Sequence, residues 1–476
     1  MWSTLLIYGI GIIYVILIVS TTTIVMLENR QPAKTIAWLL VIVLLPVIGL
    51  ILFYFFGQNI RKERFIGRKT FDQLTKVMLH EAEYTPPVFD FPKYHRLVKL
   101  NERRNRSLLT SDNRIQIITS GNQFVSELIR CIYQAQKHIH LQTYIIEDDA
   151  VGRLIRDALA DRVRDGVEVR LLYDDVGCWN VSNRFFESFI TRGIRVEAFL
   201  PVKFPSLTHR INYRNHRKVC IIDGTTGFIG GMNLAERYLN RKGHIWRDLH
   251  LKIEGPAVGS LQRIFVSDWY FVCNSLLKSP VYFPKINVGQ SLQPTAYVQI
   301  VSANPVSRYP EIMYSLTWAI QHAERYLYIQ TPYFLPTEPV LQALQTAAMS
   351  GVDVRIMVPE KPDTFWLRWG NDSFFKVMLS TGVRIFVYSG GFLHSKSCVA
   401  DDDWCTVGSS NMDFRSFENN FEANAFIYDS CTAKQVKQIF MDDLKKCQEI
   451  HLDEWMKRPI LHKYLESLTR ILSPLL

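Results

Sequence analysis

The stretch "HRKVCIIDGTTGFIGGMN" at residues 216–233 contains a histidine, a lysine two positions later and an aspartate five positions after the lysine. The stretch "HSKSCVADDDWCTVGSSN" at residues 394–411 has the same three residue types at the same spacing, and it ends on an asparagine at the same offset. Apolar residues follow each lysine, which is typical of a buried strand. Because residues i and i+2 of a strand lie on one face, each motif presents an imidazole and an ammonium side by side.

The sequence around the two motifs also repeats in the same order. "QAQKHIHLQTYI" at 134–145 resembles "QHAERYLYIQTPYF" at 321–334, and "GVEVRLLYDD" at 166–175 resembles "GVDVRIMVPE" at 351–360. Each half alternates helical patterns with short apolar strands, which predicts α/β units with a mainly parallel or mixed sheet and helices outside. Two α/β/α halves related by a pseudo-twofold axis would bring both motifs to one site.

The N-terminus predicts a transmembrane helical hairpin. Residues 1–27 and 35–57 contain no charged side chain, and each run can cross a hydrocarbon core of about 30 Å. A secretory signal peptide fits less well, because there is no basic leading region and a second apolar run follows at once. The basic stretch "RKERFIGRK" at 61–69 predicts that the remainder of the chain is cytoplasmic.

The charge of the chain points to an anionic partner. Its 476 residues have a formal net charge of +10, and residues 61–106 contribute twelve Lys and Arg against six Asp and Glu. This stretch is either a solvated linker or a segment attracted to an anionic membrane leaflet, and its position beside the hairpin favours the leaflet. The eight cysteines have no metal-ligand spacing, which predicts reduced thiols.

The paired motifs predict chemistry at phosphorus. Two lysines are suited to holding a phosphate group, and two histidines can supply a nucleophile and a general acid for a two-step displacement. No carboxylate cluster accompanies the motifs, so we expect no metal and no other cofactor. The predicted organisation is a membrane hairpin, a basic linker and two catalytic halves, at residues 1–60, 61–106, 107–285 and 286–476.

The two motifs, the N-terminal hairpin and the C-terminus resemble those of a known family. The two motifs look like the signature motifs of the phospholipase D superfamily, over essentially all of 107–476. The hairpin and the C-terminal "RILSPLL" look like those of the bacterial cardiolipin synthases of that superfamily. The resemblance implies catalytic roles for His216, Lys218, Asp223, His394, Lys396 and Asp401.

In detail, the resemblance implies that His216 attacks the phosphorus of phosphatidylglycerol and that His394 moves the protons. Lys218 and Lys396 would bind phosphate oxygens, with Asn233 and Asn411 as further donors. The two aspartates of the motifs would hold the structure together more than touch substrate.

Each histidine also needs an acceptor for its other ring nitrogen. By position in the sequence, Asp248 would serve His216 and Glu422 would serve His394. The alternative is that both are surface carboxylates without such a role. The second half has serines at 409–410 where the first has glycines at 230–231, so hydroxyl donors are expected to be richer there.

Two aromatic segments, "CWNVSNRFFESF" at 178–189 and "TFWLRWGNDSFFKVML" at 364–379, either enter the membrane interface or pack in the core. The C-terminal residues 461–472 have apolar spacing typical of an amphipathic helix, more often docked on its own protein than on a membrane.

The resemblance implies a multi-pass enzyme of the bacterial plasma membrane that joins two phosphatidylglycerols into cardiolipin and glycerol. Its partners would be this substrate and anionic lipids, with no nucleic acid expected. The alternatives are a membrane phospholipase D that uses water as acceptor, a phosphodiesterase acting on nucleic acid, and an inactive scaffold. The sequence makes no prediction of oligomeric state.

Overall fold

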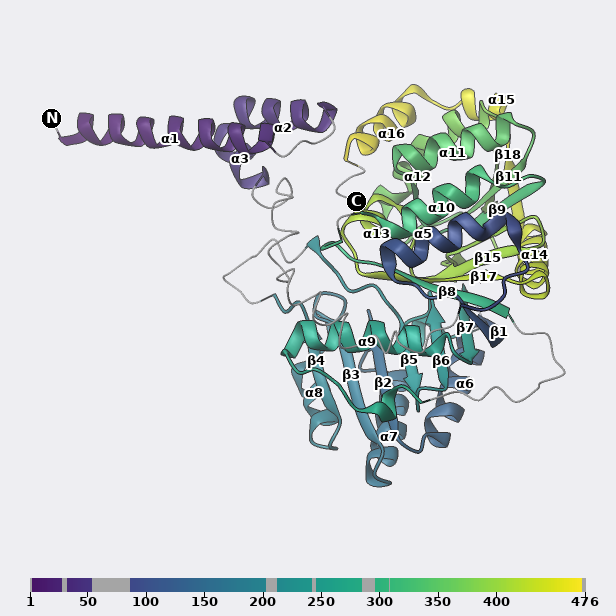
Figure 1. Cartoon of the computed structure of the whole chain (residues 1–476). Helices are drawn as coiled ribbons and strands as arrows, with labels where there is room; N and C mark the ends of the chain where they lie inside the picture. Colours follow the sequence, from purple (N-terminus) through teal and green to yellow (C-terminus); the bar gives the residue numbers. More distant parts are fainter. Residues whose placement is uncertain are drawn as a thin grey trace. The chain divides into compact units, whose positions relative to one another are not determined.

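The computed structural model describes residues 2–27, 32–53, 86–202, 212–241, 245–284, 296–307 and 309–472. The chain divides into two compact units, one of residues 1–72 and 202–212 and the other of the remaining residues (Figure 1). The stretch "RKERFIGRK" and much of the predicted basic linker lie outside the described residues.

The first unit is helical. It contains α1 (Trp2–Leu27), α2 (Pro32–Leu44) and α3 (Pro46–Leu52). Val25, Ile42 and Phe53 form a small buried cluster among these helices. Over the described residues, no helix meets the combined requirements of length and apolarity for crossing a membrane.

Among the residues that the structure describes, the second unit is built on a 16-stranded mixed sheet, and the strand order of one half repeats that of the other. The order is β4-β3-β2-β5-β6-β7-β1 in the first half and β12-β11-β9-β14-β15-β17-β8 in the second, with β18 beside β12. Strands β2, β3 and β4 of the first half are parallel to one another, as are β9, β11 and β12 of the second, whereas β18 is antiparallel to β12. The motif strands β5 and β14 are antiparallel to their neighbours. The predicted mixed sheet of repeated α/β halves is therefore confirmed.

The elements of the first half are β1 (Thr110–Ser120), α6 (Gly121–Gln134), β2 (His138–Thr143), α7 (Ala150–Arg164), β3 (Glu168–Asp174), α8 (Asn183–Ile190), β4 (Arg195–Phe199), β5 (Val219–Ile222), β6 (Thr226–Gly230), β7 (Trp246–Glu254) and α9 (Val258–Cys273).

The elements of the second half are β8 (Ala296–Ala303), α10 (Glu311–Gln321), β9 (Tyr326–Gln330), β10 (Phe334–Leu335), α11 (Glu338–Met349), β11 (Asp353–Pro359), α12 (Phe365–Leu379), β12 (Arg384–Tyr388), β13 (Phe392–Leu393), β14 (Ser397–Ala400), β15 (Trp404–Gly408), β16 (Met412–Asp413), α13 (Phe414–Glu418), β17 (Glu422–Tyr428), α14 (Ser430–Leu444), β18 (Cys447–Ile450), α15 (Leu452–Met456) and α16 (Ile460–Leu472).

Helices cover both faces of the sheet because strand side chains alternate. Ile139 and Leu141 of β2 enter the apolar core formed with α6, α7 and α8. His138 and His140 of the same strand point to the other face, where both contact Gln262 of α9. The second half repeats this arrangement, with α14 in the place of α9.

The two halves exchange strand partners beside the two motifs. In the second half, β13 pairs in parallel with β7 of the first half, and the amide of His394 then donates to the carbonyl of Arg247 at 2.7 Å. In the first half, Asn215 bridges to Phe421 just before β17, and the amide of His216 donates to the carbonyl of Phe421 at 3.0 Å. Each motif therefore begins against the last long strand of the other half.

Part of the segment assigned to the linker belongs to the catalytic unit instead. Residues 92–105 form the short helix η4 (Pro92–Tyr94) and α5 (His95–Asn105). Tyr94, Leu97 and Val98 are buried in the apolar core of the second half. The basic composition of residues 61–106 hid these few apolar residues, which lie at helical spacing.

Candidate active site

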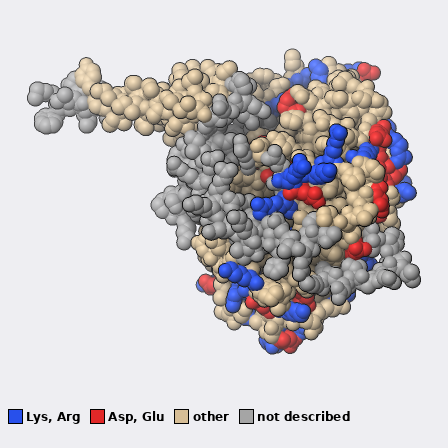
Figure 2. All heavy atoms as spheres, viewed as in Figure 1, with Lys and Arg blue, Asp and Glu red and all other residues tan. Residues whose placement is uncertain are grey.

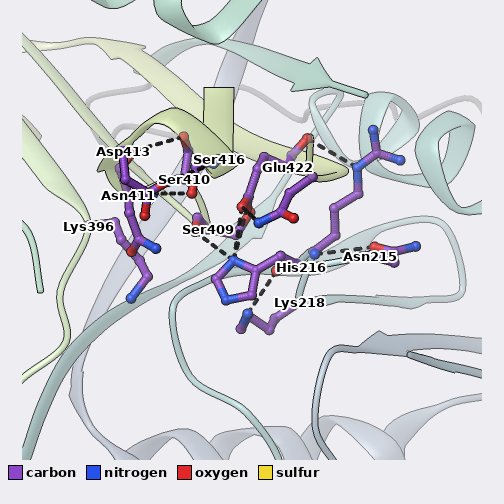
Figure 3. Close-up of polar contacts among 12 residues, drawn as sticks. Asn215, His216, Lys218, Lys396, Ser409, Ser410, Asn411, Asp413, Ser416 and Glu422 are labelled. Carbon is purple, nitrogen blue, oxygen red and sulfur yellow. Dashed lines mark hydrogen bonds and ion pairs between the residues drawn. The ribbon is translucent and has the colours of Figure 1, made fainter. Parts of the chain in front are cut away.

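His216 lies just before β5 and faces a carboxylate of the other half. Its Nδ1 is 3.0 and 3.1 Å from the two carboxylate oxygens of Glu422, the first residue of β17, and 3.1 Å from the carbonyl oxygen of Ser409 (Figure 3). The Nζ of Lys218 donates to the carbonyl of His216 at 2.8 Å. With Nδ1–H donating to Glu422, the Nε2 lone pair is left available for chemistry.

His394 has the matching arrangement. Its Nδ1 lies 2.7 Å from Oδ2 of Asp248, which is on β7 of the first half. The Nζ of Lys396 donates to the carbonyl of His394 at 2.5 Å. Asp248 and Glu422 are both fully buried, so each carboxylate has few partners other than those of the site.

The pairing predicted from the sequence is therefore wrong, although both carboxylates belong to the site. Asp248 serves His394 and Glu422 serves His216, the reverse of the prediction. The physical reason is the exchange of strand partners, because β7 runs beside the segment that leads to His394 and β17 begins beside the segment that leads to His216. Order along the chain does not reveal such an exchange.

The two motifs are close enough to influence each other electrostatically. Burial lowers the pKa of His394 well below its usual value, and the charges of Lys396, Lys218 and His216 lower it further. Burial also lowers the pKa of Lys396 to about 8, against the opposing charges of Asp248 and Glu422. Figure 3 shows the Lys218 side chain beside the His216 imidazole and the Lys396 side chain on the other side of the same group of residues.

The two carboxylates differ in their surroundings. Burial raises the pKa of Glu422, but His216, Lys218 and the Ser409 hydroxyl outweigh it, and the net effect is a lowered pKa. The Ser409 Oγ donates to Glu422 at 2.5 Å, so the expected additional hydroxyl donor of the second half is present. Asp248 has no such hydroxyl, and burial raises its pKa to about 6. The site is thus asymmetric despite the repeat.

The aspartates of the motifs have a structural role. Asp223 accepts hydrogen bonds from the backbone amides of residues 136–138 at 2.7–2.9 Å, at the start of β2. Asp401 accepts those of residues 324–326 at 2.8–3.1 Å and the Nζ of Lys93 at 2.5 Å. Both have positive φ, so each also forms the turn after its motif strand.

Replacing Asp223 by alanine is expected to destabilise the fold by roughly 3 kcal/mol, because three backbone donors lose their acceptor. The turnover of the enzyme that remains folded should change little. Thermal or urea unfolding of the purified variant measures the first effect, and kcat per folded molecule measures the second. Asp157→Ala, an exposed position on α7, is the control. A large fall in kcat at unchanged stability would contradict the structural role.

The two asparagines do not occupy equivalent environments. The side-chain oxygen of Asn233 accepts from the amide of Ile145 at 3.1 Å, and its amide nitrogen donates to the hydroxyl of Tyr238. Asn233 therefore holds the wall of the site. Within the described part of the chain, the buried side-chain oxygen of Asn411 has no hydrogen-bond partner.

Two aromatic rings that line the site were not predicted from the sequence. The ring of Tyr144 lies 4.9 Å from that of His216 and 5.1 Å from the Nζ of Lys218. The ring of Trp246 lies 5.1 Å from that of His394. The available signals were the place of Tyr144 directly after β2 and the place of Trp246 two residues before Asp248.

Two arginines next to the histidine segments, the buried Arg217 and the partly buried Arg247, were also not predicted. Arg217 donates to Asp268 of α9 at 2.6 and 2.7 Å and to the carbonyls of Ala303 and Glu422 in the second half at 2.8 and 3.1 Å. Arg247 donates to Asp443 of α14 at 2.9 Å. Both arginines join the two halves at the strand exchange.

Metal ions in proteins are held by sets of ligating side chains such as His, Cys, Asp and Glu. Among the described residues, no group of three His, Cys, Asp or Glu is placed to hold a metal ion. All eight cysteines are free, as predicted.

The chain is similar in sequence to proteins of known families. The family model described as "Cardiolipin synthase, PLD-like domain" matches residues 128–269 and 316–444, and one described as "Phospholipase_D-nuclease N-terminal" matches residues 12–58. The chain is 37% identical to "Cardiolipin synthase 2" of Bacillus anthracis, over 95% of this chain and 89% of that protein. It is 36% identical to the "Major cardiolipin synthase ClsA" of Bacillus subtilis (strain 168), over 98% of each chain.

One solved structure has a similar fold. A phosphatidylserine synthase of Haemophilus influenzae Rd KW20 superposes with a TM-score of 0.61 at 16% identity, covering 80% of this chain and 100% of that one.

Proposed function

We propose that this chain joins two phosphatidylglycerols into cardiolipin and glycerol. The starting point is its family, because the chain belongs to the bacterial cardiolipin synthases of the phospholipase D superfamily. Members of this family are phosphatidyltransferases, and so is this chain. The observation that supports the proposed mechanism most strongly is the pair of imidazoles that each hold a buried carboxylate at Nδ1, with two buried lysines beside them.

In the first step, Nε2 of His216 attacks the phosphorus of one phosphatidylglycerol. The P–N bond forms, the bond from phosphorus to the glycerol oxygen breaks, and His394 gives its proton to that oxygen. Glycerol leaves and a phosphatidyl-histidine remains. Glu422 supports this assignment, because an ionised carboxylate on Nδ1–H makes Nε2 more electron-rich.

In the second step, a glycerol hydroxyl of another phosphatidylglycerol attacks the same phosphorus. His394, now neutral, takes the proton of that hydroxyl, and the P–N bond to His216 breaks. Lys218 and Lys396 stabilise the charge on the phosphate oxygens in both steps. The negative charge of the bound diester opposes the lysine charges that lower the pKa of His394, and so helps it hold the proton that the first step requires.

The test is the purified full-length protein in mixed micelles containing phosphatidylglycerol, with and without a chelator, and with products identified by mass spectrometry. Cardiolipin and glycerol in equal amounts, undiminished by the chelator, are expected. Phosphatidic acid as the sole lipid product would show that water is the acceptor. Cleavage of DNA or RNA instead would overturn the lipid substrate.

The pH dependence should report the charge of Lys396. Because its pKa is lowered to about 8, the ammonium is present below that pH and is lost above it. Burial also lowers the pKa of Lys218 well below its usual value, so kcat/KM is expected to fall by at least about tenfold for each pH unit above 8 as ammonium charge is lost. Lys396→Arg keeps its charge in this range, so it should make that fall less steep even if the overall rate is lower. An unchanged alkaline limb in this variant would contradict the assignment.

We also propose that residues 1–57 anchor the enzyme as a two-span hairpin in the bacterial plasma membrane, with the catalytic unit in the cytoplasm. Support comes from the two uncharged runs, the family match over residues 12–58, and the exposure of apolar side chains along α1, such as Ile12 at 61% and Val19 at 59%. The basic stretch at 61–69 supports the orientation.

Anionic lipids are the proposed partners, in preference to nucleic acid. On the face drawn in Figure 2, Lys and Arg are interspersed with Asp and Glu over the described surface. A nucleic-acid-binding protein would favour clustered basic residues along one face.

A further inference from the structure

The C-terminal helix α16 exposes its apolar side. Leu461, Tyr464, Leu468 and Ile471 follow one another at intervals of three and four residues, so they form one stripe along the helix. Their exposed fractions are 62%, 67%, 43% and 76%. We call these four residues the α16 stripe. An amphipathic helix of a globular protein usually turns such a stripe toward its core.

The polar side of α16 faces the protein instead. Glu466 is buried and accepts two hydrogen bonds from Arg458, at 2.5 and 3.0 Å. Thr469 is also buried, and its methyl group lies beside Gly370 of α12. The helix is therefore docked on its own protein, as predicted, but through the opposite face from the one that its pattern favours.

The helix beneath α16 carries an exposed tryptophan. Trp366 of α12 is 51% exposed, and its ring lies 6.0 Å from that of Trp369 in an edge-to-face arrangement. Tryptophan and tyrosine are the side chains most favoured at the membrane–water interface. The corresponding segment of the first half, residues 178–189, buries Phe185, Phe186 and Phe189 of α8 in the core. It exposes Trp179 to 54%, but among the described residues no exposed apolar helix like α16 lies beside it.

The helix α12 also holds the segment 332–334, which follows β9 of the second half. Asn371 of α12 accepts from the amide of Phe334 at 2.8 Å and donates to the carbonyl of Pro332 at 3.2 Å. Between these two residues, the hydroxyl of Tyr333 donates to Asp363 at 2.7 Å. The charge of Asp363 acts on catalytic Lys396. The segments next to α12 therefore carry a charge, that of Asp363, which acts on the site.

The charges on these helices suit an anionic surface. Within α16, the charged side chains that reach solvent are Lys463 and Arg470, whereas its acidic residue, Glu466, is buried and paired. Arg368 of α12 is also exposed. The exposed acidic residues nearest to them in sequence are Asp453 and Glu454 of the preceding α15 and Asp363, whose carboxylate accepts from the hydroxyl of Tyr333.

We propose that the α16 stripe and Trp366 form a membrane-docking surface that lies in the interfacial layer of an anionic bilayer and holds the catalytic centre at its lipid substrate. The inference rests on the proposed lipid substrate but not on which histidine is the nucleophile. A second copy of the chain is a poorer occupant, because four side chains offer far less than the roughly 800 Å² per partner of a stable protein interface. The α16 stripe also combines apolar, aromatic and basic side chains, the composition of interfacial helices.

The first test measures contact with acyl chains directly. Leu468→Cys and Leu154→Cys are prepared in full-length protein in which the exposed Cys431 is replaced by serine, and both are labelled with an environment-sensitive fluorophore. Leu154 is the matched control, because it is a leucine on α7 of the other half that is 48% exposed. Labelled protein without either new cysteine gives the background.

After reconstitution into phosphatidylglycerol bilayers, brominated acyl chains are expected to quench the label at 468 and not the label at 154. Equal quenching at the two positions, or none at either, would overturn the proposal. A signal at 468 that depends on protein concentration and not on the brominated lipid would show that a second copy covers the stripe.

The second test separates docking from folding. Leu468→Glu is expected to lower turnover of phosphatidylglycerol in bilayers by about tenfold. Turnover of a short-chain phosphatidylglycerol dissolved as monomers should stay unchanged, and Leu154→Glu should change neither rate. Equal losses on both substrates, or no loss on bilayers, would overturn the proposal. Wild-type enzyme inactive on both substrates would instead refute the proposed function, while the fluorescence result would still stand.

Discussion

Replacing His216 by alanine is expected to reduce cardiolipin formation by roughly 10⁴-fold or more, because the reaction then loses its covalent route. His394→Ala should cause a loss of similar size, because the glycerol oxygen would have to leave without a proton. Initial rates in mixed micelles measure both variants. His322→Ala, a histidine that contacts Trp318 on the surface of α10, is the control and should keep full activity.

The two histidines can be told apart by where the lipid phosphate becomes attached. Phosphatidylglycerol labelled in its phosphate is mixed with enzyme for a few turnovers, the reaction is stopped at alkaline pH, and the peptides are examined by mass spectrometry. The adduct is expected on the peptide that contains His216, which has the ionised Glu422 at Nδ1. An adduct on the His394 peptide would reverse the proposed roles, and a burst of product without any adduct would exclude the covalent mechanism.

Gly231→Ala should be nearly as damaging, although glycine takes no part in the chemistry. A Cβ at this position would lie 2.2 and 2.6 Å from the two carboxylate oxygens of Asp248. Real contacts are never so short, so Asp248 would have to move away from Nδ1 of His394. Without this acceptor, nothing fixes which ring nitrogen of His394 carries the proton or how its imidazole is oriented. We expect a fall in kcat of roughly 10²-fold or more.

A matched substitution separates this effect from the general cost of adding a methyl group. Gly259 of α9 has no atom within 4 Å of where its Cβ would be. Gly259→Ala should therefore preserve activity and stabilise the helix by about 0.5–1 kcal/mol. Reaction rates measure the activity of both variants. Circular dichroism and melting temperatures show whether each variant is folded and how stable it is. Wild-type kcat in a folded Gly231→Ala enzyme would show that the contact between Asp248 and His394 is dispensable.

The repeat made much of this architecture predictable. Two copies of one spacing, inside halves that align along their length, predict a mixed α/β sheet with both motifs at one centre. The structural role of Asp223 was also foreseen, because the resemblance assigned it to the fold and its carboxylate indeed ties the motif turn to β2. Such features depend on residue types and local periodicity, which a sequence displays directly.

The partners of Asp248 and Glu422 could not be predicted in the same way. Both lie at the start of a strand in their own half, and the simplest inference gave each to the histidine of that half. The outcome depends on which backbone segments pair, and the pairings of Leu393 with Arg247 and of Asn215 with Phe421 join residues far apart in the chain. No side-chain pattern encodes these contacts.

The orientation of α16 was unpredictable for a different reason. Its spacing correctly indicates an amphipathic helix, but periodicity does not say which face is turned inward. A buried ion pair between Glu466 and Arg458, outside the periodic pattern, fixes the polar face against the protein. For residues 92–105 the existence of the helix itself was hard to predict. The stretch is rich in charged residues, and the few apolar residues that form the buried face of α5 are not prominent in it.

The exchange of strand partners has a consequence during protein synthesis. A nascent chain that has left the ribosome only as far as Glu254 already carries His216, Lys218 and Asp248, yet the carboxylate that activates His216 has not been made. Glu422 arrives only when most of the second half has emerged. A chain that ends before Glu422 therefore lacks the acceptor that orients His216, and the catalytic centre can be assembled only after the start of β17 has emerged.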